Sequence, residues 1–123
     1  MILQNHPNAD IGVSVVWIHM LPSDNRRAAI RAAQTIVDPR VRHFHDPKKR
    51  AGKIIARSLG EPDYVAWDIY LFYPVGSTWD TLPSVPSHWA HQVSERWADH
   101  FHYGDDLANE LRKIARQLMA QYE

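Results

Sequence analysis

The segment that most constrains the fold is the run of residues 12–20, which is rich in β-branched and aromatic side chains. Successive side chains of a strand point to opposite faces of a sheet, and in this run both sets are mainly apolar. A strand of this kind is typical of a parallel sheet, because helices cover both of its faces there. We therefore expect residues 12–20 to form a strand that is covered on both sides.

A helix is expected to follow this strand. Residues 26–37 carry apolar side chains at helical spacing. Ser23 or Asp24 is the expected cap, because either side chain can accept hydrogen bonds from the free N–H groups of the first turn. Asp38 and Pro39 end the helix, since the residue before a proline disfavours the helical region of the backbone.

The next strand and helix repeat this order. Residues 41–45 are predicted to form a short strand. Asp46 then caps a helix that has Pro47 in its first turn and Gly60 just after its end. A strand–helix–strand arrangement of this kind pairs its two strands in parallel through a right-handed crossover.

The most apolar run, residues 65–73, has two mainly apolar faces and is predicted to be the central strand. Proline and glycine mark residues 74–87 as a loop. Residues 88–93 are the expected fourth strand, with a helix that begins within residues 87–101 as the alternative. Residues 105–122 form the last helix. The predicted fold is a single-domain α/β protein in the order β-α-β-α-β-β-α. It has one four-stranded mixed sheet with helices on both faces.

Composition limits the class of protein. With 123 residues, 45% hydrophobic side chains and no net charge, the chain fits one folded domain over residues 12–123, after a lead-in of residues 1–11. No apolar run approaches the roughly 20 residues that span a membrane, and the polar N-terminus does not resemble a signal peptide. We therefore expect a cytoplasmic protein. The absence of cysteine excludes disulfides, thiol nucleophiles and dithiol redox couples.

The order of the elements resembles that of the thioredoxin-like superfamily. Members of that family place a Cys-x-x-Cys motif, often with proline third, where the first strand meets the first helix. The corresponding stretch here has a proline at the matching place and other residues at both cysteine positions: Met20, Leu21, Pro22 and Ser23. The resemblance implies a cysteine-free, non-redox member, because dithiol exchange requires a thiolate.

The resemblance also implies a surface for a ligand or partner at the place of the family's active site. That surface combines the end of the first strand with the segment that stands where the family has a cis-proline. Its residues are Met20, Leu21, Pro22, Ser23, Tyr64, Val65 and Ala66.

Histidine is the most unusual feature of the composition. Six of the eight histidines fall in close pairs, and two histidines that are two residues apart on a strand share a face. Imidazole nitrogen binds zinc, nickel and copper. The candidate ligands are His43, His45, His88, His91, His100 and His102. A metal centre requires three of them, or two with an aspartate, to converge; the alternative is that they are ordinary surface or hydrogen-bonded histidines.

Asp68 is a carboxylate within the apolar central strand. Buried carboxylates in such surroundings include catalytic acids. Asp68 with His91 or His19 would form an acid–base pair. The structural alternative is a carboxylate that accepts hydrogen bonds from an indole, an arginine or the backbone.

Two further features concern the surface. Seven basic residues lie between Arg40 and Arg57, but no RNA-binding motif accompanies them, so a solvated helix face is favoured over a nucleic-acid site. Trp79 and Trp89 flank the proline-rich loop, where an exposed tryptophan would indicate a binding surface.

These observations lead to two hypotheses for the function. The first is a non-enzymatic binding or accessory role that needs no cofactor, with a protein partner, a second copy of the chain or a small ligand. It predicts an exposed apolar patch around residues 20–22 or around the two tryptophans. The second is transition-metal binding, or metal-assisted or acid–base catalysis, by the histidines.

Overall fold

The computed structural model describes residues 2–93 and 96–121. Its elements, in chain order, are α1 (Ile2–Asn5), β1 (Val13–Ile18), α2 (Arg26–Ala33), β2 (Val41–Asp46), α3 (Arg50–Ser58), β3 (Ile69–Phe72), β4 (His88–His91), the 3-10 helix η1 (Ala98–His100) and α4 (Asp105–Ala120). From β1 to α4 the order of strands and α-helices is the predicted one.

The chain divides into two compact units. The parallel unit comprises residues 10–66 and contains β1, α2, β2 and α3. The antiparallel unit comprises the described residues of 1–9 and 67–123 and contains α1, β3, β4, η1 and α4. The segment predicted to be a lead-in, residues 1–11, contains the short helix α1.

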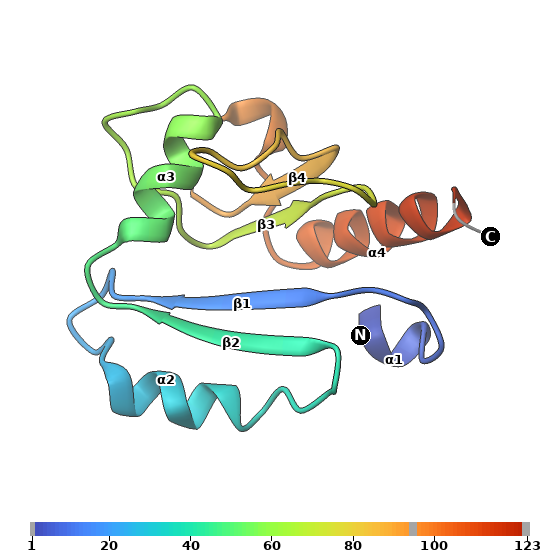
Figure 1. Cartoon of the computed structure of the whole chain (residues 1–123), viewed down its shortest axis with the longest axis horizontal. Helices are drawn as coiled ribbons and strands as arrows, with labels where there is room; N and C mark the ends of the chain where they lie inside the picture. Colours follow the sequence, from blue (N-terminus) through green and yellow to red (C-terminus); the bar gives the residue numbers. More distant parts are fainter. Residues whose placement is uncertain (1, 94–95, 122–123) are drawn as a thin grey trace. The chain divides into compact units, whose positions relative to one another are not determined.

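In the parallel unit, β1 and β2 pair in parallel, from Val13 opposite Val41 to Ile18 opposite Asp46 (Figure 1). Helix α2 lies along this pair, and α3 follows the end of β2. Burial alternates along β1: Val13, Val15 and Trp17 are half-buried, whereas Ser14 and Val16 are exposed. The prediction that this strand is covered on both sides is therefore wrong.

The cap of α2 is Asn25, whose side-chain oxygen accepts a hydrogen bond from the Ala28 N–H at 2.8 Å. The predicted caps, Ser23 and Asp24, lie before it. Asp24 instead accepts hydrogen bonds from the backbone N–H groups of Met20 and Leu21, at 2.9 and 2.7 Å. Its carboxylate therefore orders the loop between β1 and α2.

Lys49 rather than Asp46 stands at the cap position of α3, and Pro47 lies before the helix instead of in its first turn, so both predictions are wrong in position. The side chain that bonds the first turn is nevertheless that of Asp46. Its carboxylate accepts hydrogen bonds from the N–H groups of Arg50, Ala51 and Gly52, at 2.7, 3.0 and 3.4 Å. This side chain is buried, with 7% of its surface exposed. Three of the N–H groups that a helix leaves free at its start are thereby satisfied.

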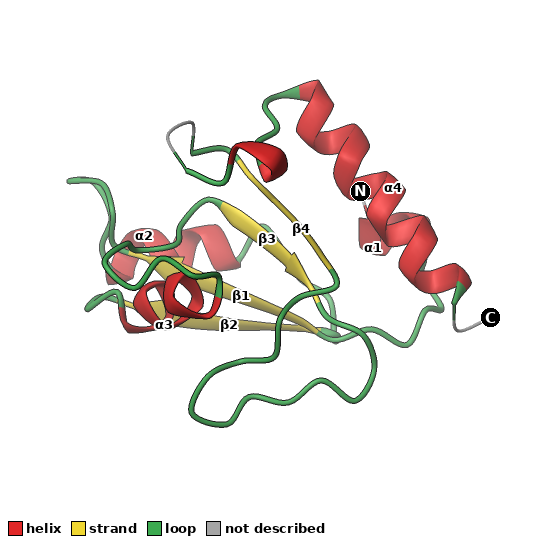
Figure 2. Ribbon diagram, turned by 90° about the horizontal axis from the view of Figure 1, so that it is seen from above, coloured by secondary structure: helices red, strands yellow, loops and turns green. Residues whose placement is uncertain are grey.

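The antiparallel unit contains a β3–β4 hairpin, from Ile69 opposite His91 to Phe72 opposite His88, and α4 lies along β4 (Figure 2). The fourth strand is thus confirmed. The apolar stripe of α4 is also confirmed, because Leu107, Leu111, Ile114 and Ala115 are buried. Leu107 and Leu111 form a core with Ala90, against which Ile2 and Phe72 pack.

The predicted four-stranded mixed sheet is wrong, because the described strands form two separate two-stranded sheets. The predicted central strand is the element that differs most. Ala66 donates its backbone N–H to the Gly52 carbonyl of α3 at 2.9 Å rather than to a neighbouring strand. Asp68 then has a φ of 50°, in the left-handed region that interrupts an extended chain. Only Ile69–Phe72 remains as a strand, and it pairs with β4.

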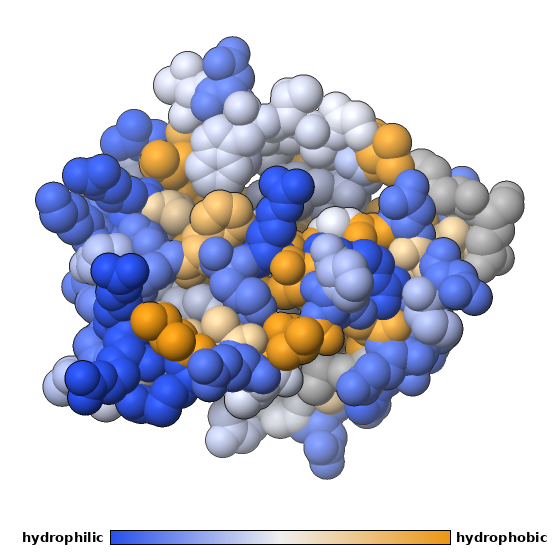
Figure 3. Space-filling model, turned by 60° about the horizontal axis from the view of Figure 1, so that its bottom comes forward, coloured by the Kyte–Doolittle hydropathy of each residue, from blue (hydrophilic) through white to orange (hydrophobic). Residues whose placement is uncertain are grey.

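On the face shown in Figure 3, hydrophobic side chains occur in groups among hydrophilic residues. Among the helices of the described residues, none has the length and apolar character needed to cross a membrane.

Candidate functional site

At the carboxyl ends of β1 and β2, the imidazoles of His19 and His45 face each other. Their Nε2 atoms lie 2.5 Å apart, and their ring centroids lie 4.5 Å apart with the planes tilted by 55°. In a hydrogen bond between two imidazoles, one Nε2 carries the proton and donates it while the other accepts. Both side chains are half-buried. We call these two side chains the imidazole pair.

The parallel sheet itself brings the two histidines together. His45 is opposite Trp17 in the register, and His19 follows two residues after Trp17, on the same face. The His19 N–H also donates to the Asp46 carbonyl at 3.4 Å, which holds the end of β1 beside the end of β2. In open α/β sheets, ligands bind at this carboxyl end of the strands.

Asp24 contributes a negative charge to the site. The N–H groups of Leu21 and Met20 hold the pKa of Asp24 below its ordinary value, and the nearby positive form of His19 lowers it further. Asp24 is therefore a carboxylate at neutral pH, next to the imidazole pair. Its negative charge favours a cation at His19.

The spacing of the imidazole pair is close to what one metal ion requires. Zinc bonds imidazole nitrogen at about 2.0–2.1 Å in tetrahedral geometry, which places two such nitrogens about 3.3 Å apart. Starting from 2.5 Å, the two Nε2 atoms would reach this spacing through a separation of less than about 1 Å.

His43 shares a face with His45, as the sequence indicates, but both of its ring nitrogens are occupied. The Trp17 indole N–H donates to His43 Nδ1 at 3.0 Å, and His43 Nε2 donates to the Ile36 carbonyl at 3.0 Å. The Trp17 and His43 rings are also stacked, with an angle of 11° between their planes. His43 is therefore a structural residue, and His19 takes the place beside His45 that was predicted for His43.

His91 is the most buried histidine, with 1% of its surface exposed. Its Nδ1 accepts the Val93 N–H and its Nε2 donates to the Trp97 carbonyl, each at 3.0 Å. Both nitrogens are thus occupied by the backbone of the antiparallel unit, and the ring packs against Trp89 and Phe101. His91 supports the fold and offers no nitrogen to a metal or to Asp68.

The three remaining candidate histidines each have a different local partner. His88 Nδ1 contacts the Ser87 hydroxyl at 3.0 Å, and His102 Nδ1 lies 2.7 Å from an Asp106 oxygen. His100 Nδ1 donates to the Trp89 carbonyl at 3.0 Å. Residues 2–93 and 96–121 contain no group of three histidine, cysteine, aspartate or glutamate side chains arranged to hold a metal. The structure does not bring the six candidate histidines together.

Asp68 is half-buried, and its partner is Gln92 rather than a histidine. Its side-chain oxygen accepts the Gln92 amide N–H at 3.0 Å, and its backbone carbonyl accepts the Gln92 backbone N–H at 3.2 Å. Burial raises the pKa of Tyr70, and the negative charge of Asp68 raises it further. The Asp68 carboxylate is thus hydrogen-bonded within the fold, but its donor is a glutamine amide rather than the indole, arginine or backbone group that was expected.

The predicted ligand surface separates into an exposed and a packed part. Leu21 is 52% exposed, and Pro22 and Ser23 are exposed with it, while Met20 is half-buried. Tyr64 and Val65 are half-buried and Ala66 is buried. Val65 and Ala66 pack against Gly52 of α3, and the exposed residues of the predicted surface are Leu21, Pro22 and Ser23.

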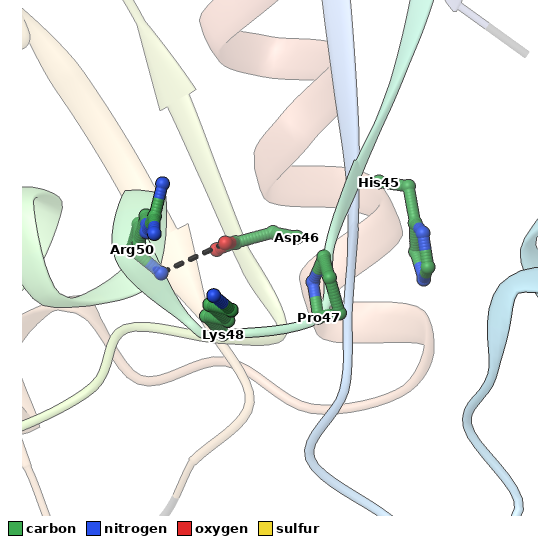
Figure 4. Close-up of a pocket in the computed structure, with 5 residues that line it drawn as sticks. All are labelled: His45, Asp46, Pro47, Lys48 and Arg50. Atoms are coloured by element: carbon green, nitrogen blue, oxygen red, sulfur yellow. Dashed lines mark hydrogen bonds between the residues drawn. The ribbon is translucent and has the colours of Figure 1, made fainter.

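An open depression of about 230 Å³ lies beside the imidazole pair, lined by His45, Asp46, Pro47, Lys48 and Arg50. Figure 4 shows His45 on the opposite side of the strand from Asp46, which points toward Arg50. The Asp46 carboxylate already accepts the N–H groups at the start of α3. It therefore occupies the position at which a bound anion would receive those hydrogen bonds.

The loop between β3 and β4 carries exposed apolar residues. Trp79 is 53% exposed, whereas Trp89 is half-buried and stacks on His100 with ring centroids 3.8 Å apart. The Ser84 hydroxyl joins the two sides of the loop, since it donates to the Thr78 carbonyl and accepts the Thr78 N–H. Trp79 thus meets the expectation of an exposed tryptophan, and Trp89 does not.

His19 is the residue that reasoning from the sequence did not include among the metal ligands. It has no histidine partner near it in the sequence, so its role depends on the register of β1 with β2. The sequence did hold one signal for His19. Val15, Trp17 and His19 are spaced two residues apart, and residues at this spacing share one face of a strand.

Comparisons of the chain with protein-family models, with curated proteins and with solved structures found no match.

Proposed function

We propose that this chain is a metal-binding protein that takes a divalent first-row transition metal, with Zn²⁺ as the reference ion, through Nε2 of His19 and Nε2 of His45. The observation that carries this proposal is the 2.5 Å approach of these two nitrogens. Zn²⁺, Ni²⁺ and Cu²⁺ all accept imidazole ligands. The proposal combines parts of the two hypotheses drawn from the sequence. It takes the binding role from the first and the histidine metal ligands from the second.

Three features around the imidazole pair support the proposal. His43 and His91 have both ring nitrogens occupied by other groups of the fold, whereas among the described residues Nε2 of His19 and Nε2 of His45 are hydrogen-bonded to each other. The Asp24 carboxylate favours positive charge at His19. The site lies at the carboxyl end of two parallel strands, the usual place for ligands in α/β sheets.

The proposed role is binding rather than catalysis. A catalytic zinc has about three protein ligands and an open position for water, and the imidazole pair supplies two. The cytoplasmic location expected from the sequence is part of the same proposal.

Isothermal titration of the untagged chain with ZnCl₂ tests the proposal. We expect saturable binding by the unaltered chain and a loss of at least tenfold in affinity in His19→Ala and in His45→Ala. His88→Ala is the matched control, because it removes a half-buried histidine from the other unit and should bind Zn²⁺ as the unaltered chain does. Far-UV circular dichroism checks that each variant is folded. Equal binding by all four proteins would contradict the proposal.

A further inference from the structure

The imidazole pair leaves two positions of a tetrahedral metal ion unfilled. Zinc in structural sites is almost always bound by four ligands. Within residues 2–93 and 96–121, no third histidine, cysteine, aspartate or glutamate joins a set that could hold a metal. The remaining ligands of a metal on His19 and His45 therefore have to come from another molecule.

The side chains nearest the imidazole pair are already in use. The Asp24 carboxylate accepts two backbone N–H groups of its own loop. The Asp46 carboxylate accepts three N–H groups of α3. Both ring nitrogens of His43 are hydrogen-bonded. Recruiting any of these groups as a ligand would break hydrogen bonds that order the strand ends.

The surface around the pair is open to a second molecule. On the β1 side, Leu21 is 52% exposed and is followed by exposed Pro22 and Ser23. On the β2 side, Pro47 and Lys48 are exposed. A second molecule that bound at the imidazole pair would also cover the apolar surface of Leu21.

The overall charge permits association of identical chains. The chain carries 14 basic and 14 acidic residues, so its net charge is zero. Two copies near neutral pH therefore have no long-range repulsion to overcome, and proteins without net charge associate more readily.

From these observations we infer that a second copy of the chain completes the metal site. The ion lies on the two-fold axis of a dimer, and each protomer contributes Nε2 of His19 and Nε2 of His45, which gives four nitrogen ligands. A two-fold interface brings the same surface of both protomers together, so one imidazole pair is matched by the other. This inference rests on the proposed metal-binding function and adds the partner and the stoichiometry.

Light scattering on a gel-filtration column, with and without ZnCl₂, tests the inference on the untagged full chain. We expect the mass to double from 14.3 kDa when Zn²⁺ is added and to return when EDTA is added. Binding in a parallel titration should saturate at half an ion per chain. His19→Ala and His45→Ala should each remain monomeric with Zn²⁺, while His88→Ala should dimerise like the unaltered chain.

The outcomes separate the inference from the proposed function. Saturation at one ion per chain without a change in mass would overturn the dimer and leave the metal-binding proposal intact. An absence of histidine-dependent binding would overturn both. A dimer that forms without Zn²⁺, or larger assemblies that persist in His19→Ala and His45→Ala, would overturn the inference, because the imidazole pair would then not hold the chains together.

Discussion

The hydrogen bonds of the two ring nitrogens decide what each histidine of this chain can do. In His43 and His91 both nitrogens are bonded within the fold. In each of these rings Nδ1 accepts a hydrogen bond from an N–H group, and Nε2 donates one to a carbonyl oxygen. In the imidazole pair, by contrast, Nε2 of His19 and Nε2 of His45 are hydrogen-bonded to each other and to no other group among residues 2–93 and 96–121. The neighbours of each histidine thus separate those with structural roles from the two for which we propose metal binding.

His91 should be the histidine whose loss most destabilises the chain. His91→Ala leaves the half-buried Val93 N–H without its partner, removes one of the two hydrogen bonds to the Trp97 carbonyl, and removes a ring that packs against Trp89. We expect a loss of about 2–4 kcal/mol in the free energy of unfolding. His88→Ala, on the same strand, should cost about 1 kcal/mol or less. Urea denaturation followed by circular dichroism gives both values, and similar losses in the two variants would contradict the structural role of His91.

Asp38 should make the stability of the chain depend on acid pH. The Arg40 side chain donates to both carboxylate oxygens, at 3.0 and 2.9 Å, and the Arg40 backbone N–H donates as well. These bonds lower the pKa of Asp38 from 3.8 to about 2. Because the pKa is lower in the folded chain, the stabilisation is fully present above about pH 4 and is lost as the pH falls toward 2.

Thermal unfolding between pH 5 and pH 2 measures this dependence. Asp38→Asn should lose less stability over this range than the unaltered chain does, since the titrating carboxylate is absent. Asp63→Asn is the control, because it removes an exposed carboxylate for which the described residues show no ion pair. If Asp38→Asn and the unaltered chain lost stability in parallel, the ion pair with Arg40 would not contribute.

At the scale of elements, α3 packs so closely against the rest of the parallel unit that position 52 of the helix requires glycine. A Cβ atom at Gly52 would lie 2.7 Å from the Ala66 carbonyl oxygen and 2.7 Å from side-chain atoms of Ile18 and Val65. Alanine normally stabilises a helix by about 1 kcal/mol relative to glycine. Here the overlap should reverse the sign, and we expect Gly52→Ala to destabilise the chain by about 1–3 kcal/mol.

Gly12→Ala is the matched control for Gly52→Ala. A Cβ atom at Gly12 would meet no atom within 4 Å, and its backbone is not in the left-handed region. It should be neutral or stabilising by about 0.5 kcal/mol. Urea denaturation of both variants tests the pair, and a stabilising Gly52→Ala would contradict the close approach of α3 to residues 65 and 66.

The order of the elements could be predicted from the sequence, but the pairing of the strands could not. Hydrophobic periodicity and proline or glycine at the ends locate each element, and both are properties of short segments. Strand pairing depends on where backbone N–H groups find partners. The Ala66 N–H bonds to Gly52, and Asp68 turns the chain with a positive φ. Neither contact has a signature in the local pattern, which shows only an apolar run.

The candidate site was predictable to a similar degree. His45 and the residue 20–23 segment could be identified, because a histidine pair and a strand–helix junction are local features. His19 could not, since its approach to His45 follows from the register of β1 with β2. His43 was included because strand parity is visible in the sequence, whereas its hydrogen bonds to Trp17 and Ile36 are not.

At the scale of the whole molecule, buried apolar residues are distributed unevenly between the two units. In the antiparallel unit, Ala90, Leu107, Leu111, Ile114 and Ala115 are buried. In the described residues of the parallel unit the buried hydrophobic side chains are Ala56 and Ala66. Burial of apolar surface is the main source of local stability. The parallel unit, which carries the imidazole pair, should therefore open more readily than the antiparallel unit.

Hydrogen exchange followed by mass spectrometry tests this difference on the full chain. Without metal, we expect the slowest exchange in α4 and β4 and faster exchange in β1 and β2. A ligand at about 100 times its dissociation constant stabilises the form that binds it by about 2.7 kcal/mol, equivalent to about 100-fold slower exchange through opening. Because Zn²⁺ is proposed to join the ends of β1 and β2, it should slow exchange in those strands and leave α4 nearly unchanged. The same experiment on His45→Ala should show no effect of Zn²⁺. Equal protection of both units without metal would contradict the uneven stability, and slowing that is confined to α4 would place the metal away from the imidazole pair.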